Sequence, residues 1–513
     1  MTRPTRIAVA ATNALAVQAG LALAKSGGSA VDAAIATMLV TSVTEPGVIS
    51  PLGGAFVNVW PAGGEPILID GSVEMPGRGL PRERFGGGVR ELFTEYAGGL
   101  TVFVGHGSAA TPGAFAAMGL AHERYGRAPW AEVVAPAVAA ARDGYPLGAS
   151  AASYLAVTGD SIFGWDQQTR AAISRPDGTI AAAGDRITSP DLAASMEIIA
   201  AEGPSSIYTG ELADRMTKDM EQNGGLVTRD DLAQYRAVER EPLRVRLGEW
   251  SMATNPPPSV GGPVLTALLR LWTERDPAGG SLDDLVAIQR RVLDYRRSHL
   301  DVAHDLGAAG RELLELVRTA GALGLPTSAS TAHVSVTDAD GVACAITASA
   351  GYGSGATVPG TGLMLNNCLG EPELNRLGLH ALRPGTRLAS NMAPTTAVRD
   401  DGARLAIGTP GADRITTTLM QVLDGFCLRG LDLQEAIDRR RLHVRLLADA
   451  SWRVDHEVDP ALAVAATRSG LPSYEHPPGL SLYFGGVGAA LLGPDRRLSA
   501  AADPRREAAI GAS

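Results

Sequence analysis

The stretch TAHVSVTDADGVACAITAS, residues 331–349, gives the first indication of how this chain folds. Apolar and polar residues alternate over residues 333–337 and again over residues 342–348, as is typical of β-strands. Asp338-Ala339-Asp340-Gly341 lies between the two runs and has the turn residues of a hairpin. Thr331 comes directly before the first strand, a position that by itself is typical of an ordinary loop-to-strand junction.

Further elements are expected on both sides of this hairpin. Residues 7–11, 55–60, 405–407 and 481–484 read as strands, and residues 14–25, 30–43, 114–124, 130–143, 191–201, 211–222 and 282–300 read as helices. Residues 276–281 and 306–329 read as the loosest parts of the chain. Helices mixed with hairpin-paired strands favour a layered α+β fold over a regular βαβ array.

Composition limits the possible partners. The 513 residues are 45% hydrophobic and 19% charged, which indicates a folded globular core. The formal net charge is −10, so we expect no nucleic-acid partner and no anionic membrane partner. The apolar run at residues 33–43 is too short to span a bilayer, and we expect a cytoplasmic protein.

Neither the cysteines nor the histidines form a metal-binding pattern. Cys344, Cys368 and Cys427 have no zinc-site spacing and are expected to be buried free thiols. No His-x-x-x-His or Cys-x-x-Cys spacing occurs, so no metal and no cofactor are predicted. We expect His443 and His456 to lie on the surface or in loops.

Several stretches together resemble the gamma-glutamyltranspeptidase family, in the same order, from near Ile7 to near Arg506. The stretches are Gly27-Gly28-Ser29-Ala30-Val31-Asp32-Ala33-Ala34, Ala141-Arg142-Asp143-Gly144-Tyr145-Pro146, Gly224-Gly225-Leu226-Val227-Thr228, Pro257-Pro258-Ser259, Leu365-Asn366-Asn367, Gly408-Thr409-Pro410-Gly411 and Asp503-Pro504-Arg505. Each stretch alone is a weak signal, whereas their joint order over almost the full length is a strong one.

The resemblance implies a four-layer αββα N-terminal-nucleophile hydrolase made as one precursor. Cleavage between Ser330 and Thr331 would give a large subunit, residues 1–330, and a small subunit, residues 331–513, that stay together as a heterodimer. Thr331 would be the nucleophile, and its new α-amine, with a pKa near ~7.7–8.0, would be the base.

The resemblance also assigns supporting roles around the nucleophile. Ser349 would support the Thr331 hydroxyl from the neighbouring strand, and the backbone N–H groups of Gly411 and Ala412 would bind the oxyanion. Only the backbone is needed at Ala412, so its departure from the family's glycine is tolerable. His333 shares a face with Thr331 but is expected to be structural, because the amine already supplies the base.

The substrate pocket departs from the family. The arginine that grips a glutamyl α-carboxylate is replaced by Ser72 or Val73, and Arg78 nearby is expected to be solvated. The remaining predicted pocket residues are Ser390, which matches the family, and Gly351, Cys368, Glu371 and Asn391, which replace an asparagine, a glutamine, an aspartate and a second serine. Because a bidentate arginine–carboxylate contact is missing, we expect a small amide or acyl substrate of a specialised pathway rather than glutathione.

Two alternatives stay open. The same threonine and oxyanion donors could attack a ketone or oxalyl carbonyl, which would make the protein a carbon–carbon bond hydrolase. A chain that stays uncut would instead be a non-catalytic homologue with a binding or structural role. The state of the bond between residues 330 and 331 separates this last possibility from the first two.

Overall fold

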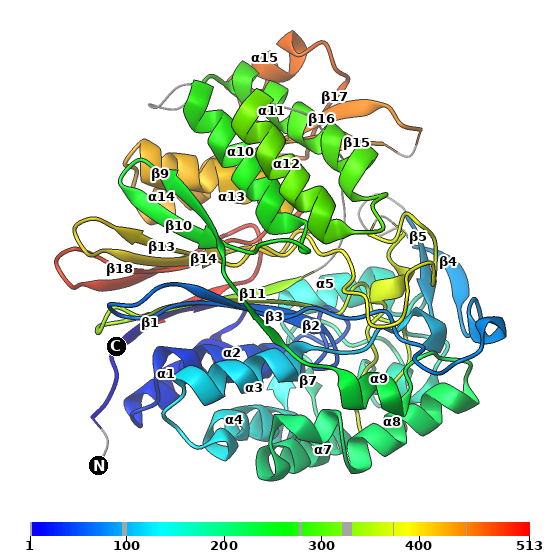
Figure 1. Ribbon diagram of the computed structural model, residues 1–513. Helices are drawn as coiled ribbons and strands as arrows, with labels where there is room; N and C mark the ends of the chain where they lie inside the picture. Colours follow the sequence, from blue (N-terminus) through cyan, green and yellow to red (C-terminus); the bar gives the residue numbers. More distant parts are fainter. Residues whose placement is uncertain (1–2, 95–99, 276–279, 321–330, 373, 448) are drawn as a thin grey trace.

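Two β-sheets face each other at the centre of the protein, and helices cover the outer face of each sheet (Figure 1). This computed structural model describes residues 1–513 except 1–2, 95–99, 276–279, 321–330, 373 and 448. The architecture confirms the expected α+β fold with four αββα layers.

The first sheet contains the predicted hairpin near its middle. Its strands follow the order β20 (Ala509–Ala512), β1 (Ile7–Ala11), β11 (Ala332–Asp338), β12 (Ala343–Ser349), β2 (Gly54–Trp60), β3 (Ile67–Gly71) and β8 (Val238–Arg240). All neighbours in this sheet run antiparallel. Strands from both ends of the chain therefore enclose the hairpin that begins after Thr331.

The second sheet draws its strands mainly from the C-terminal third of the chain. Its order is β19 (Leu498–Ala502), β18 (Gly488–Leu492), β14 (Arg404–Gly408), β13 (Thr395–Arg399), β10 (Trp250–Thr254) and β9 (Leu243–Leu247). Smaller sheets lie outside the sandwich: β15 (Leu442–Leu446) with β16 (Trp452–His456) and β17 (Ser473–Glu475), β4 (Arg90–Thr94) with β5 (Leu100–Val104), and β6 (Tyr145–Pro146) with β7 (Arg186–Ile187).

Helices form the two outer layers (Figure 1). On the side of the first sheet are α1 (Ala14–Lys25), α2 (Ala30–Thr44), α3 (Ala114–Tyr125), α4 (Trp130–Asp143), α5 (Ala149–Thr158), α6 (Gln167–Ala172), α7 (Pro190–Glu202), α8 (Glu211–Gln222) and α9 (Arg229–Gln234). On the side of the second sheet are α10 (Gly261–Arg275), α11 (Leu282–Tyr295), α12 (Leu306–Ala320), α13 (Arg414–Leu423), α14 (Leu433–Asp438) and α15 (Pro460–Arg468).

The two faces of β11 contact different layers. Val334 and Val336 belong to the apolar core shared with α1–α4. His333 and Ser335 point the other way, where His333 lies against Gly408 and Ser335 donates a hydrogen bond to the carbonyl oxygen of Gly488, 3.0 Å away. A Cβ on Gly408 would come within 2.3 Å of the His333 ring, so the close approach of the two sheets requires glycine there.

Most expected elements are confirmed to within one or two residues, but several expectations are wrong. Residues 481–484 do not pair as a strand, because Leu482–Phe484 forms a 3-10 turn. Residues 306–320 are helix α12, whose buried Leu313 and Val317 pack in the second core; residues 321–329 and 276–279 lie outside the described part. The helix expected over residues 282–300 is confirmed in extent, as α11 continues after Tyr295 into a π-helix at Arg296–Leu300.

The expectations for single side chains are partly wrong too. His443 and His456 are buried instead of lying on the surface, at 0% and 3% exposure. Cys344 and Cys368 are buried free thiols as expected, whereas Cys427 is half-buried.

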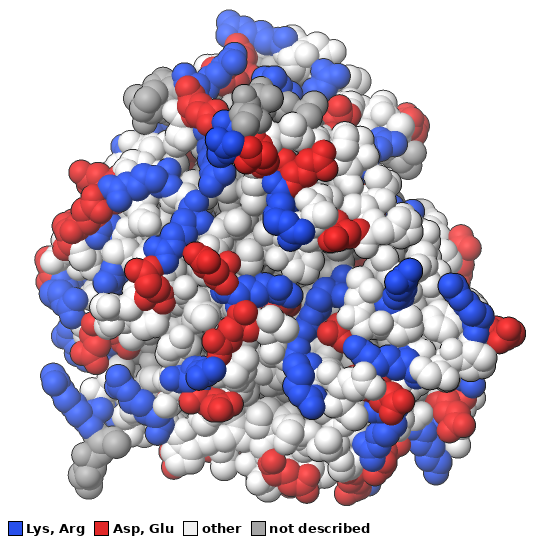
Figure 2. Space-filling view, in the orientation of Figure 1, with Lys and Arg blue, Asp and Glu red and all other residues white. Residues whose placement is uncertain are grey.

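Charged residues of both signs are interspersed over the face of the molecule seen in Figure 2. Among the described residues, no helix has the length and apolar character needed to cross a bilayer.

Asn58 of β2 connects the two sheets through its side-chain hydrogen bonds, and its replacement should lower the stability of the fold. Its Nδ2 donates to the carbonyl oxygens of Ala253 (2.8 Å) and Pro394 (3.0 Å), and its Oδ1 accepts from Thr396 Oγ1 (2.9 Å). We expect Asn58→Ala to lower the free energy of unfolding by about 2 kcal/mol or more, because buried partners lose their hydrogen bonds. Urea unfolding measures this, with exposed Asn223→Ala as the control; equal effects of the two changes would contradict it.

Candidate active site

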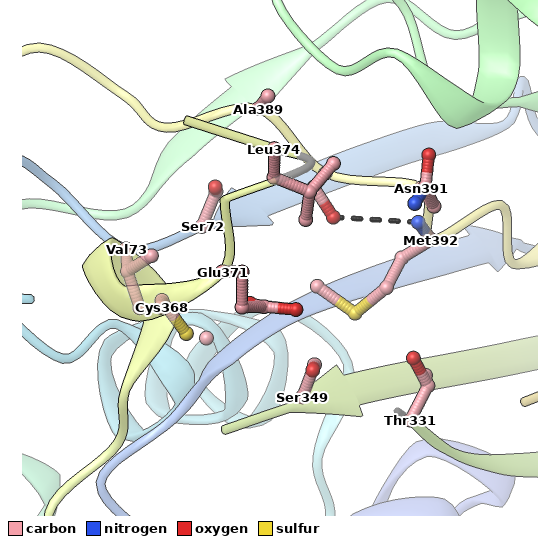
Figure 3. Close-up of a pocket in the computed structure, with 12 residues that line it drawn as sticks. Ser72, Val73, Thr331, Ser349, Cys368, Glu371, Leu374, Ala389, Asn391 and Met392 are labelled. Carbon is pink, nitrogen blue, oxygen red and sulfur yellow. Dashed lines mark hydrogen bonds between the residues drawn. The ribbon is translucent and has the colours of Figure 1, made fainter. Parts of the chain in front are cut away.

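The strand register places Thr331 opposite Ser349. Ala332 of β11 pairs with Ala348 of β12, so the next pair outward is Thr331 and Ser349, at the open end of the hairpin. Ser349 pairs in turn with Gly54 of β2. Figure 3 shows both hydroxyl-bearing side chains on adjacent strands, pointing into the same pocket. The predicted nucleophile and its supporting hydroxyl are therefore brought together by ordinary antiparallel pairing.

The pocket encloses about 400 Å³, including the part that is open to solvent. Its walls are Gly54, Ser72, Val73, Thr331, Ser349, Cys368, Glu371, Leu374, Ala389, Ser390, Asn391 and Met392. Six of the predicted site residues are in this set, whereas Gly351, Gly411 and Ala412 do not line it. Ser330 lies outside the described residues. Thr331 is 3% exposed, so the reacting group is shielded from bulk water.

The segment 390–392 forms the wall facing the hairpin, and a glycine-rich turn holds it. The carbonyl oxygen of Ser390 accepts hydrogen bonds from the N–H groups of Val260 (3.0 Å) and Gly261 (2.9 Å) at the start of α10. A Cβ on Gly261 would lie 2.2 Å from the carbonyl oxygen of Asn391. The proline-serine-glycine loop noted in the sequence thus positions the Ser390-Asn391 wall.

Glu371 reaches the pocket from a loop fixed by the two neighbouring asparagines. Asn366 Nδ2 donates to the carbonyl oxygens of Leu52 and Ala110, both at 2.9 Å, and Asn367 Oδ1 accepts from the N–H of Tyr352 at 2.5 Å. These bonds fasten the loop to the strand ends around Thr331.

Gly351 makes room for this loop. Its φ is +65°, and an added Cβ would lie 2.1 Å from Asn367 Oδ1 and 3.0 Å from Glu371 Oε1. Its N–H donates to Ser349 Oγ at 3.2 Å. Gly351 therefore shapes the site through the backbone and not as a wall of the pocket.

Cys368 lies in the pocket as a neutral group. Burial and the neighbouring Glu371 carboxylate raise the pKa of the Cys368 thiol well above its usual range. A protonated thiol is a poor nucleophile, so Cys368 is unreactive at neutral pH.

The Gly411-Ala412 turn connects β14 to α13. Both residues have positive φ, +128° and +67°, and within the described part of the chain neither N–H donates to another protein group. These N–H groups lie next to the N-terminus of α13, where the helix dipole favours negative charge. The turn can bind an anion through its backbone, as oxyanion donors must.

Asp413 follows this turn and is held by a buried histidine. His443 Nε2 and Asp413 Oδ2 are 2.8 Å apart, and both side chains are completely buried. Arg414, together with His443, overcomes the cost of burial and lowers the pKa of Asp413. His443 was expected on the surface, but it fixes the turn that carries Gly411 and Ala412.

His333 is confirmed as a hydrogen-bonded, structural residue. Its Nε2 lies 2.7 Å from Ser335 Oγ, which already donates to Gly488, so Nε2–H is the donor. Nδ1, 2.8 Å from Thr347 Oγ1, then accepts. Burial lowers the pKa of His333 to about 3, which keeps the imidazole neutral.

The side chains of Arg78 and Arg387, which lie near Ser72 and Val73 in the fold or the sequence, pair with groups outside the pocket. Arg78 pairs with Glu74 (3.0 Å) and Asp231 (3.3 Å), so it is ion-paired and not solvated as expected. Arg387 lies beside Glu74 and donates to the carbonyl oxygen of Ser72. Neither arginine lines the pocket, and Glu371 is the one charged side chain among the described lining residues.

Sequence reasoning missed several residues around Thr331. Leu374, Ala389 and Met392 supply apolar wall, and their positions follow from loops that carry no periodic signal. Arg506, which donates to the carbonyl oxygen of Thr331, was also missed, although it directly follows the Asp503-Pro504-Arg505 motif.

Known proteins resemble this chain over almost its whole length. The sequence model of the gamma-glutamyltranspeptidase family matches residues 16–513. The glutathione hydrolase proenzyme of Escherichia coli (strain K12) is 30% identical, covering 97% of this chain and 90% of the relative.

The chain belongs to the gamma-glutamyltranspeptidase family.

Other similar proteins are named as acylases. The Acylase ACY 1 proenzyme of Pseudomonas sp. (strain SE83) is 30% identical, covering 96% of this chain and 91% of that protein. The crystal structure of cephalosporin acylase from Bacillus halodurans superposes with a TM-score of 0.79 at 24% identity, covering 99% and 96% of the two chains. The relatives of this chain therefore include a glutathione hydrolase and an acylase, and the last comparison supports the fold alone.

Over the described residues, no cluster of three or more His, Cys, Asp or Glu side chains could hold a metal ion.

The buried His333 generates a prediction about acid stability. An unfolded histidine titrates near ~6.5, whereas the pKa of folded His333 is about 3. Between these values the unfolded chain binds one more proton, so His333 lowers stability as the pH falls, by at most about 1.4 kcal/mol per pH unit. We expect the contribution of His333 to the change of unfolding free energy with pH to vanish in His333→Gln. The glutamine amide can make both hydrogen bonds but does not titrate.

Urea unfolding at pH 7, 6 and 5 measures this difference in slope between the wild type and His333→Gln. Exposed His304→Gln is the control and should keep the wild-type slope. A His333→Gln protein with an unchanged slope would contradict the assignment of a neutral, buried imidazole.

Proposed function

We propose that this protein is an autoprocessed amide hydrolase or acyl transferase whose nucleophile is Thr331. The observation that carries this proposal is the position of Thr331, opposite Ser349 in one shielded pocket. Its relatives are proenzymes that include a glutathione hydrolase and an acylase, which supports chemistry on an amide carbonyl.

Processing begins with the peptide bond between residues 330 and 331. The Thr331 hydroxyl attacks the carbonyl carbon of Ser330, the C–N bond breaks, and an ester joins the two residues. Water then hydrolyses the ester, leaving a carboxylate on Ser330 and a free amine on Thr331. Cleavage therefore exposes the nucleophile and creates its base in one event.

Turnover uses the same groups on a substrate amide. The α-amine of Thr331 takes the proton of its own hydroxyl, whose oxygen attacks the substrate carbonyl. The N–H groups of Gly411 and Ala412 bind the resulting oxyanion, and Ser349 donates to the nucleophilic oxygen. The leaving amine takes the proton, and water or an acceptor amine then releases the acyl group from Thr331.

The sheet topology supports a stable heterodimer of residues 1–330 and 331–513. Strands β11 and β12 of the small subunit lie between β1 and β2 of the large one, and β13 pairs with β10 in the second sheet. Separating the subunits would break both sheets and expose their cores, so one cut before Thr331 leaves the fold intact.

The pocket favours an acyl group with no free carboxylate. Glu371 attracts an amine or another cation, while the position of the carboxylate-binding arginine is held by Ser72 and Val73. A glutamyl α-carboxylate would meet no cationic side chain among the described lining residues and would face the Glu371 charge. We therefore infer a small amide or acyl substrate from a specialised pathway, rather than glutathione.

The carbon–carbon bond hydrolase stays an alternative on the same site. Thr331 and the Gly411-Ala412 turn could attack an oxalyl ketone as they attack an amide. Assaying an oxalyl ketone beside an amide of the same acyl size separates the two reactions.

Thr331 should control both processing and turnover. We expect Thr331→Ala to remain one intact chain and to lose amide hydrolysis, because both reactions need the hydroxyl. Thr331→Ser, which keeps a hydroxyl, should still be cut. A denaturing gel and N-terminal sequencing of the smaller fragment measure this. An intact, active wild-type chain, or an active Thr331→Ala variant, would contradict the proposal, and an intact, inactive wild type would support the non-catalytic homologue.

A matched pair of anilides tests the proposed substrate class. 4-Aminobutanoyl p-nitroanilide is γ-glutamyl p-nitroanilide without its α-carboxylate, and both keep the amine that Glu371 would bind. We expect kcat/KM for the compound without a carboxylate to be higher by about tenfold or more, which corresponds to about 1.4 kcal/mol. Faster turnover of the γ-glutamyl compound would overturn the inferred class, and a Val73→Arg variant should reduce the difference.

A further inference from the structure

Arg506 contacts the backbone of the proposed nucleophile. Its Nη1 donates to the carbonyl oxygen of Thr331 at 3.2 Å, and its Nη2 donates to Glu45 Oε2 at 2.8 Å. Thr331, Glu45 and Arg506 come from the hairpin, the end of α2 and the C-terminal segment. One guanidinium thus joins three parts of the chain at the reacting residue.

We propose that the Arg506–Glu45 pair positions Thr331 by its carbonyl and tunes the basicity of its α-amine. This rests on the proposed function, in which that amine is the base. Arg506 acts through the Thr331 backbone and does not line the pocket, so it is a positioning residue rather than a catalytic one.

The pair is built rigidly into the fold. The side chains of Arg506 and Glu45 are 10% and 6% exposed, which limits screening of their charges. Glu45 caps the C-terminal end of α2, where its carbonyl oxygen accepts from the N–H groups of Val48 and Ile49. The stem of Arg506 lies over Gly486, where an added Cβ would come within 3.0 Å of it.

The same contact brings a positive charge close to the amine. Within one residue the nitrogen and the carbonyl oxygen are at most about 3.6 Å apart, so the Thr331 amine lies within about 7 Å of Arg506 Nη1. A nearby cation disfavours the ammonium form and lowers the pKa of an amine. Glu45 pairs with the other terminal nitrogen of the guanidinium and offsets part of this effect.

The other ionisable groups around Thr331 are few among the described residues. His333 on β11 is neutral, because burial lowers its pKa to about 3. Tyr145 is neutral too, because burial and the Glu45 charge raise its pKa. Glu371 lines the same pocket as Thr331, and its negative charge favours the ammonium form. Among these groups, the positive charge of Arg506 therefore lowers the pKa of the Thr331 amine, whereas the negative charge of Glu371 raises it.

The test measures the amine directly and needs no substrate. The full-length protein is allowed to process itself and is then treated with cyanate, which carbamylates neutral amines. Mass spectrometry of the N-terminal peptide of the small subunit gives the labelling rate at each pH. Compared with the wild type, Arg506→Met should move the midpoint of the pH dependence of this labelling rate upward by about one pH unit. Glu45→Gln should shift it downward by less, and Arg506→Lys should stay near the wild type.

Opposite shifts in Arg506→Met and Glu45→Gln distinguish charge from a general structural disturbance. Arg429→Met, which breaks another partly buried pair, with Asp424, is the control and should leave the titration unchanged. An Arg506→Met chain that melts like the wild type but stays uncut, while Arg506→Lys is cut, also supports the positioning role. Normal cleavage of Arg506→Met with a wild-type titration would overturn the proposal.

Failure of the proposed function would give a different result. A wild-type protein that is never cut, or a Thr331→Ala variant that keeps its activity, refutes the role of Thr331 itself. A cut and active wild type in which the Arg506 and Glu45 variants leave the titration unchanged refutes only the role of the pair.

Discussion

The antiparallel pairing of β11 with β12 is the interaction on which the site depends. Ala332 pairs with Ala348, and this register alone sets Thr331 beside Ser349. A slip by one residue would turn the Thr331 hydroxyl toward the helices and bring the apolar residues of β11 to the other sheet. Because one face of β11 packs on α2 and the other on the second sheet, the core that stabilises the fold also fixes this register.

The close packing of the two sheets places the turn after β14 beside the proposed site. Small residues such as Ala345 and Ala406 fill the space between them, and His333 and Asn58 find all their partners within it. The turn after β14 is thereby brought over the strand that follows Thr331. Loops at the open end of the sandwich are then free to differ, and the predicted departures from the family, such as Glu371, lie there.

Periodic patterns made the centre of the fold predictable, but long-range contacts did not follow from them. The hairpin at residues 333–348 and helices such as Trp130–Asp143 follow from apolar spacing. The helix at Leu306–Ala320 was missed because its glycines weaken the local signal, although Gly310 is required where α12 meets Pro257. Residues of the proposed site matched family motifs, whereas Arg506 and Glu45 are 461 positions apart and meet only in the folded chain.

The groups that the proposed self-cleavage needs and the groups that would select the substrate come from different parts of the fold. Self-cleavage requires a hydroxyl, a carbonyl beside it and donors for an oxyanion, all of which come from strand ends and backbone. Substrate choice depends on side chains such as Glu371 and Val73, which lie on loops and take no part in strand pairing. An arginine at position 72 or 73 would change the charge of the pocket wall without altering the strand pairing that positions Thr331. Under the proposed function, the fold would keep its cleavage chemistry while the identity of the acyl group changed.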